Sequence, residues 1–76
     1  MNKQRRKDIE KATALLEQAR EIIDTVQEGE QESYDNLPES IQDSERGETM
    51  YDNIDTLQTA SDNIGDALDT LEELEQ

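Results

Sequence analysis

The chain has 76 residues, a formal net charge of −14 and only 30% hydrophobic residues, with no Cys, His, Phe or Trp. This composition excludes disulfides and the usual zinc ligands, and it leaves too little apolar surface for a large core. No apolar run approaches the length of a membrane span, and no apolar segment of a secretory signal follows the basic N-terminus. We expect a single domain over residues 1–76 that is cytoplasmic and has no cofactor.

Charge is distributed unevenly along the chain. Residues 1–11 contain five basic and two acidic side chains, a sum of +3, whereas residues 12–76 contain two Arg and nineteen acids, a sum of −17. Such a field repels nucleic acid and anionic membranes and attracts basic proteins. We therefore expect no membrane association and no direct binding of nucleic acid, since the basic run over residues 3–7 also lacks aromatic residues for base stacking.

A first helix is predicted over about residues 3–28. Small or apolar residues recur there at alternating steps of three and four, the spacing of a coiled-coil seam: Ile9, Ala12, Leu16, Ala19, Ile23 and Val26. The segment is rich in good helix formers. Gly29 is expected to end the helix.

Residues 31–36 are expected to form a loop, and residues 37–43 a short helix at a hinge. Asn36 can cap this helix, with Pro38 in its first turn and Glu39 in the capping-box position. The apolar phase slips after this segment, which favours a break between Asp43 and Gly47. One continuous helix from Pro38 onward is the alternative.

A long helix is predicted over about residues 45–74. Its seam follows the same steps of four and three, at Met50, Ile54, Leu57, Ser61, Ile64, Leu68 and Leu71. Its outward side carries a row of acidic residues, which we call the acidic row: Asp52, Asp55, Asp62, Asp66, Asp69 and Glu73. We predict that the acidic row binds a partner protein, with anchors near the hinge at Tyr34, Arg46 and Tyr51, because Tyr and Arg are favoured at interface hot spots.

Two long helices joined by a short hinge are expected to pack antiparallel, which makes the fold all-α, a coiled-coil-like helical hairpin. Pairing positions whose numbers sum to 80 matches Ile9 with Leu71 and Val26 with Ile54. This register also brings the basic start of the chain near its acidic end, with Arg5, Lys7 and Lys11 near Glu75, Glu73 and Asp69.

The same register gathers apolar residues on one edge of the hairpin, which we call the apolar edge: Leu15, Ile22, Ala60, Ala67 and Leu74. An open apolar edge favours a further partner. We predict that two hairpins form a homodimer through this edge and so build a four-helix bundle.

Neither an enzyme nor a metal site is predicted. General acid–base catalysis usually takes His, or a carboxylate in a pocket that shifts its pKa, and this chain has no His and too thin a core for such a pocket. The acidic residues lack the EF-hand pattern, which favours a solvated face. Carboxylates three or four residues apart lie about 5–6 Å apart along a helix, a spacing broadly similar to that of DNA phosphates.

The hinge contains Leu-Pro-Glu-Ser-Ile-Gln at residues 37–42 and Ser-Glu-Arg-Gly-Glu at residues 44–48, followed by the acidic heptad helix. This combination resembles small acidic helical proteins of phages and mobile elements of Gram-positive bacteria, from about Glu17 to the end of the chain. The resemblance implies a protein that binds a host factor, such as a nuclease or another defence protein, in the host-cell cytoplasm.

Together these observations lead to a non-enzymatic protein that binds and inhibits or modulates a host protein with a basic surface, with DNA mimicry as one mode of binding. The alternative is a structural or adaptor coiled-coil dimer, in which the acidic face only keeps the protein soluble.

Overall fold

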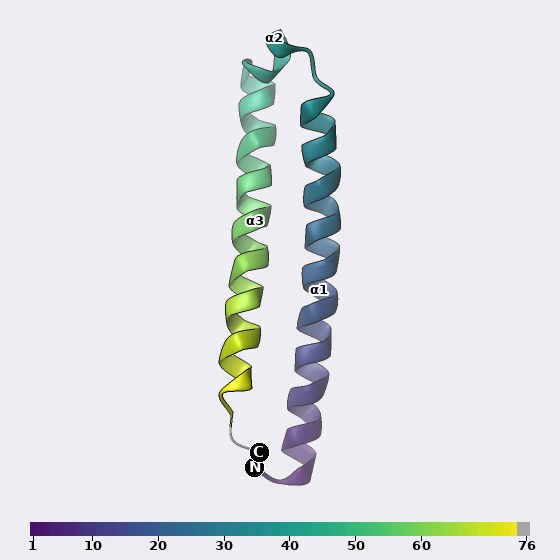
Figure 1. Cartoon of the computed structure of the whole chain (residues 1–76), viewed down its shortest axis with the longest axis vertical. Helices are drawn as coiled ribbons and strands as arrows, with labels where there is room; N and C mark the ends of the chain where they lie inside the picture. Colours follow the sequence, from purple (N-terminus) through teal and green to yellow (C-terminus); the bar gives the residue numbers. More distant parts are fainter. Residues whose placement is uncertain (75–76) are drawn as a thin grey trace.

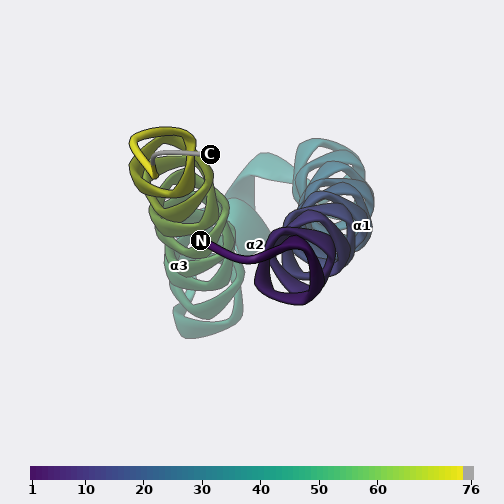
Figure 2. The same ribbon diagram turned by 90° about the horizontal axis from the view of Figure 1, so that it is seen from below.

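A computed structural model, which describes residues 1–74, folds into a helical hairpin (Figure 1). Helix α1 spans Lys3–Asp35, α2 spans Glu39–Gln42 and α3 spans Glu45–Glu72. The two long helices lie side by side and antiparallel, and α2 joins them at the end opposite the N-terminus (Figures 1 and 2). The Cα atoms span 58 × 15 × 12 Å, so the molecule is a rod. The all-α hairpin predicted from the sequence is confirmed.

Helix α1 begins where it was predicted. Asn2 is its N-cap, and the Asn2 Oδ1 atom accepts a hydrogen bond of 2.8 Å from the backbone N–H of Arg5. This contact satisfies one of the backbone donors that the first turn of a helix leaves free.

The predicted end of the first helix at Gly29, and the loop over residues 31–36, are wrong. Helix α1 continues to Asp35, and Gly29 does not adopt a positive φ. Gly costs about 1 kcal/mol relative to Ala inside a helix. The added turns bring the ring of Tyr34 against that of Tyr51 on α3, with 6.1 Å between the ring centroids. Packing against α3 thus outweighs the weak helix preference of Gly29.

The hinge helix lies inside its predicted range but is shorter. Asn36 is the C-cap of α1, and Pro38 occupies the N-cap position of α2 that had been expected for Asn36. The longer α1 leaves only Asn36, Leu37 and Pro38 between the two helices. Asp43 and Ser44 are not helical, so the predicted break between Asp43 and Gly47 is confirmed.

Gln42 and Gly47 hold the hinge against the two long helices. The Gln42 side-chain amide donates hydrogen bonds to the carbonyl oxygens of Tyr34 (3.0 Å) and Leu37 (3.2 Å). Gly47 is buried in the first turn of α3, where an added Cβ would overlap the Gln42 carbonyl oxygen. The approach of α2 to α3 therefore requires Gly at position 47.

The predicted register of the two long helices holds to within one residue. Arg20 bonds to Ser61, for which Ala19 was the expected partner. Gln27 bonds to the carbonyl oxygen of Ile54, for which Val26 was expected. A slip of seven residues, the nearest alternative that preserves the heptads, would separate both pairs by about 10 Å.

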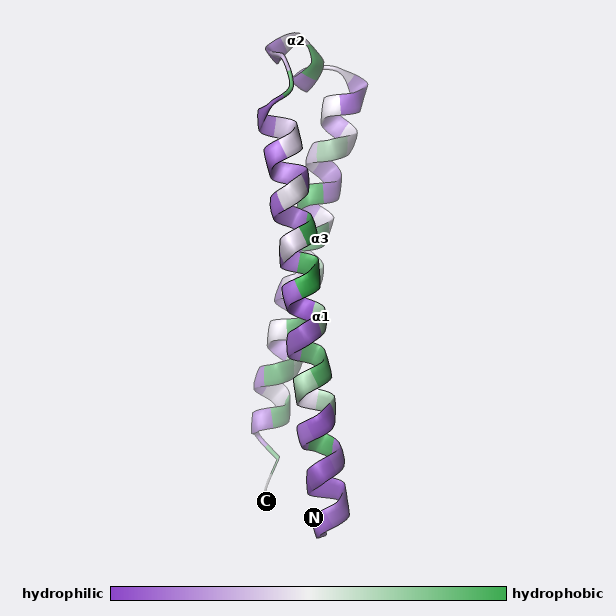
Figure 3. Cartoon of the chain, turned by 90° about the vertical axis from the view of Figure 1, so that its right-hand side faces the viewer, coloured by the Kyte–Doolittle hydropathy of each residue, from purple (hydrophilic) through white to green (hydrophobic). Residues whose placement is uncertain are grey.

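The core of the rod is thin. Within residues 1–74 the most deeply buried hydrophobic residue is Ile54, with 8% of its surface exposed. Figure 3 shows hydrophobic bands on both helices through the middle of the rod, whereas the first turns of α1 are mostly hydrophilic. No helix within these residues combines the length and apolar character needed to cross a membrane.

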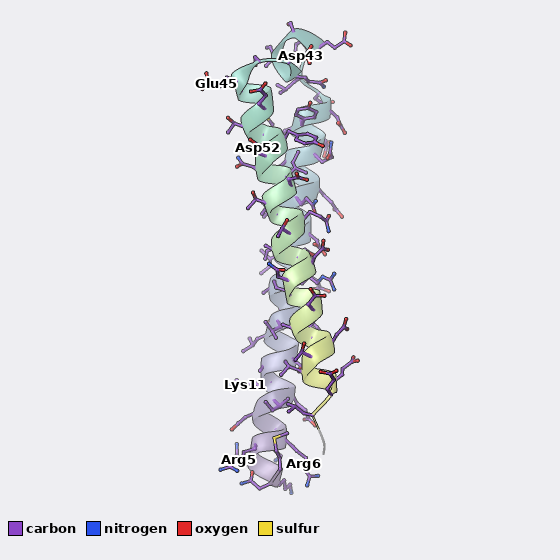
Figure 4. The ribbon with its side chains drawn as sticks, turned by 90° about the vertical axis from the view of Figure 1, so that its left-hand side faces the viewer. Arg5, Arg6, Lys11, Asp43, Glu45 and Asp52 are labelled. Carbon is purple, nitrogen blue, oxygen red and sulfur yellow. The ribbon has the colours of Figure 1, made fainter. Side chains whose placement is uncertain are left out.

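The basic start of α1 and the last turns of α3 lie at the same end of the rod, as the antiparallel arrangement requires. Figure 4 shows Arg5, Arg6 and Lys11 toward this end, and Asp43, Glu45 and Asp52 toward the hinge. The guanidinium group of Arg6 donates hydrogen bonds to the Met1 carbonyl oxygen. The predicted proximity of Arg5 to Glu75 lies outside the described residues.

Candidate interaction surfaces

One edge of the hairpin is closed by side chains that reach across from one helix to the other. We call this the polar edge, and it comprises Arg20, Gln27 and Tyr34 of α1 with Tyr51, Gln58 and Gly65 of α3. The members on each helix are seven residues apart, and seven residues are close to two helical turns. Each helix therefore presents its three members on one side. Two sets of hydrogen bonds and one pair of aromatic rings lie along this edge.

At the middle of the polar edge, a hydrogen-bonded triad links the helices. Ser61, only 2% exposed, donates from Oγ to Oδ1 of Asp24 over 2.6 Å. The same Oγ accepts a hydrogen bond of 3.1 Å from Nε of Arg20. Gly65 makes room for this arginine, because an added Cβ there would lie 2.9 Å from Nη1 of Arg20. A polar group satisfied inside a coiled-coil seam favours one register over others.

A second set of polar contacts connects the seam to the acidic row. The Gln27 amide donates to Oε1 of Gln58 over 2.8 Å, and the Gln58 amide donates to Oδ1 of Asp62 over 2.9 Å. Gln27 is itself held by the carbonyl oxygen of Ile54 on α3. The orientation of the Asp62 carboxylate is therefore coupled to the packing of the two helices.

All six members of the acidic row are exposed to solvent. They extend along α3 from the hinge toward its C-terminal end, where Glu73 is the C-cap residue, and Figure 4 marks Asp52 near the hinge end. Within the described part of the chain, no three acidic side chains gather closely enough to hold a metal ion. The carboxylates are spread along a line, an arrangement suited to an extended basic surface.

The structure brings two of the three predicted hinge anchors together. Tyr34 is half-buried and Tyr51 is exposed, and their rings meet at an interplanar angle of 58°. Arg46 is exposed, but it precedes Tyr51 by five residues, which turns its side chain about 140° away around α3. The tyrosines thus form one feature of the polar edge, and Arg46 lies on another side of the helix.

The apolar edge is open to solvent along most of its length. Leu15 and Ile22 are 55% and 66% exposed, Leu74 and Ala67 are also exposed, and Ala60 is half-buried. Val26, expected in the seam, is 49% exposed and adds to this surface. The prediction of Val26 as a covered seam residue is wrong. The heptad pattern gives the side of the helix on which Val26 lies, but not how far the side chains of α3 cover it.

Sequence reasoning also missed the triad of Arg20, Asp24 and Ser61. The sequence held a partial signal, because Arg20 is the one basic residue between Lys11 and Arg46 and the predicted hairpin places it on the same edge as Gly65. The guanidinium group of an arginine at such an edge has several N–H donors with which it can bond across the seam.

Comparisons of the chain with protein-family models, with curated proteins and with solved structures found no match.

Proposed function

We propose that this chain is a non-enzymatic protein that acts in the cytoplasm of a host cell and inhibits or modulates a host protein with a basic surface. The acidic row is the contact surface, and the partner is a defence factor or another protein that binds nucleic acid. The row occupies the groove in which that partner holds its nucleic acid. The resemblance of the hinge sequence to phage and mobile-element proteins supports the choice of a host protein as the target.

The observation that carries this proposal is the linear charge density of the rod. A net charge of −14 over a length of 58 Å corresponds to one net negative charge per about 4 Å. Duplex DNA carries one negative charge per about 1.7 Å of its axis, and a single strand one per about 3.4 Å. The charge density that the rod presents to a basic groove is therefore close to that of one nucleic-acid strand.

The rigidity of the acidic row supports the same proposal. The row lies on one continuous helix whose position is fixed by the triad and by the glutamine contacts of the polar edge. A preorganised row of charges binds with a smaller loss of conformational entropy than the same charges on a disordered tail. The exposed Tyr51 ring beside the hinge end of the row adds an aromatic anchor of the kind favoured at hot spots.

The alternative is a structural or adaptor dimer whose acidic residues only keep it soluble. The open apolar edge is the observation that favours it. The two functions differ in how binding responds to salt. Contacts of the acidic row weaken as ionic strength rises, whereas an apolar interface hardly responds.

The test begins with the tagged protein as bait in a bacterial lysate, followed by purification of the captured protein. That protein is then titrated with three chains. One is the wild type, and the second carries Asp55→Lys, Asp62→Lys and Asp69→Lys in the acidic row. The third is the matched control, with Glu21→Lys, Glu28→Lys and Asp35→Lys at exposed positions on the outer side of α1. Both variants change the net charge by the same amount.

The proposal expects the acidic-row variant to lose binding and the control to retain most of it. It also expects the wild-type chain to displace a labelled DNA duplex from the captured protein. Equal losses for the two variants would mean that only total charge matters, and unchanged binding by the acidic-row variant would exclude this row as the contact surface.

A further inference from the structure

A single hairpin buries few of its large apolar side chains fully and leaves several of them exposed. Among the described residues, Ile54 is the most deeply buried hydrophobic residue, while Leu15, Ile22 and Val26 are each about half exposed or more. A chain of this size usually needs a disulfide, a metal or oligomerisation to reach a stable fold. The sequence contains no Cys, and the described residues contain no metal-binding cluster. The architecture thus favours additional burial against another helix pair.

Apart from Leu74, the apolar edge lies within a larger face that carries no charge. On α1 this uncharged face comprises Leu15, Gln18, Ile22 and Thr25, and on α3 it comprises Thr56, Ala60, Asn63, Ala67 and Thr70. These positions recur at steps of three and four, so on each helix they share one side. Five acidic residues lie on α3 between Met50 and Leu71, and all of them belong to the acidic row, which lies on another side of the helix.

The uncharged residues of the two helices form one continuous surface near the hinge end. Val26 of α1 borders the same shallow depression as Asn53, Thr56 and Leu57 of α3. Glu30 also lines this depression, and it marks the limit of the uncharged face toward the hinge. In a chain in which 37% of residues are charged, a face without charge on both helices indicates an interface.

We propose that the uncharged face binds a second copy of this chain, with the two rods parallel and their hinge ends together. In this arrangement α1 of each copy packs on α3 of the other, and every neighbouring pair of helices in the bundle is antiparallel. Leu15 and Ile22 then lie over Ala67 and Ala60 of the second copy. Large side chains on α1 meet small ones on α3, which fills the interface evenly, whereas α1 on α1 places large against large.

Electrostatics identifies the occupant as a second copy. A basic partner gains nothing from a face without carboxylates and is attracted to the acidic row instead. Two chains of charge −14 repel one another, and the repulsion is weakest when their uncharged faces meet and the acidic rows point outward. The uncharged face therefore suits self-association, and it leaves the acidic row free.

The available area is sufficient for such a dimer. A standard interface takes about 800 Å² from each partner. This is roughly one seventh of the 5872 Å² of surface on the chain. One of the four sides of a rod supplies an area of this size.

The oligomeric state is tested by placing charge on the uncharged face without touching the seam. Gln18→Glu with Asn63→Glu should give the mass of one chain, 8.7 kDa, by size-exclusion chromatography with light scattering, whereas the wild type should give twice that mass. The matched control is Gln31→Glu with Thr59→Glu, at exposed positions away from this face, with the same net charge; it should remain a dimer. Circular dichroism checks that both variants stay helical.

The arrangement of the dimer is tested with single cysteines in this cysteine-free chain. A mixture of the Ile22→Cys chain and the Ala60→Cys chain should form a mixed disulfide under mild oxidation, because these positions face one another across the interface. The Ile22→Cys chain alone should form little cross-linked product. A wild-type chain of monomer mass at its highest soluble concentration overturns the proposal, as does a dimer that cross-links through Ile22→Cys alone.

Discussion

Arg20 of α1 and Ser61 of α3, forty-one positions apart in the sequence, are joined by a hydrogen bond of 3.1 Å from Nε to Oγ. The Ser61 hydroxyl in turn donates a second hydrogen bond, to the carboxylate of Asp24. A seam position that a coiled coil usually fills with an apolar residue is thus occupied by a hydroxyl with both of its roles satisfied. This contact fixes which turns of α1 and α3 face one another, and it thereby fixes where the acidic row and the uncharged face lie.

Ser61→Ala should destabilise the hairpin by about 1–3 kcal/mol, because Arg20 and Asp24 lose their shared partner inside the seam. The change is measured as a lower midpoint in thermal unfolding followed by circular dichroism. Ser40→Ala, at an exposed position of α2, is the control and should leave the midpoint unchanged. Equal midpoints for the Ser61 and Ser40 variants would contradict the structural role of the triad.

Gly29→Ala should stabilise the protein by about 0.5–1 kcal/mol. Gly29 lies inside α1, and an added Cβ there meets nothing within 4 Å, so the change removes backbone freedom from the unfolded chain without a clash. The measurement is urea unfolding. A loss of stability would indicate that the chain is not helical at Gly29 and that the helix ends there, as the sequence alone suggests.

Gly47→Ala should have the opposite effect and destabilise the protein by about 1–3 kcal/mol. The added Cβ meets the Gln42 backbone, and backbone atoms of the hinge cannot move aside as a flexible side chain can. Urea unfolding of the Gly29 and Gly47 variants side by side compares the same chemical change in two environments. Similar stabilities for both would contradict the close packing of α2 on α3.

The contact between the Tyr34 and Tyr51 rings should show as a coupling energy in a double-mutant cycle. Tilted aromatic pairs contribute about 0.5–1.5 kcal/mol beyond their buried area. The cycle uses Tyr34→Ala, Tyr51→Ala and the double variant, with unfolding free energies for all four chains. Strictly additive losses would show that the two rings do not meet and that the last turns of α1 are not held against α3.

The hairpin, the hinge break, most of the seam and the register to within one residue were predictable from the spacing of Ile, Leu, Ala and Ser residues. Periodicity encodes which side of a helix is covered. The end of α1 was not predictable, since Gly29 is a helix terminator by local preference and only the packing of Tyr34 on Tyr51 reverses it. The triad was missed because a hydrogen bond between distant positions leaves no periodic signal.

The division of the rod into an acidic side and an uncharged side was only partly predictable. The apolar edge followed from the heptads, but the exposure of Val26 depends on how far α3 covers it. The coupling of Asp62 to the seam through Gln27 and Gln58 requires side-chain geometry that no sequence pattern gives.

The central claim is that the acidic row on α3 contacts a basic partner, and the most direct measurement is the affinity of the captured partner as a function of salt. Between about 50 and 200 mM salt, the wild-type affinity should fall by about tenfold or more, because exposed charge contacts are screened over this range. The control variant, with Lys at positions 21, 28 and 35, should show a similar dependence of affinity on salt. The acidic-row variant, with Lys at positions 55, 62 and 69, should show little binding at any salt concentration. A wild-type affinity that does not change with salt would contradict the account.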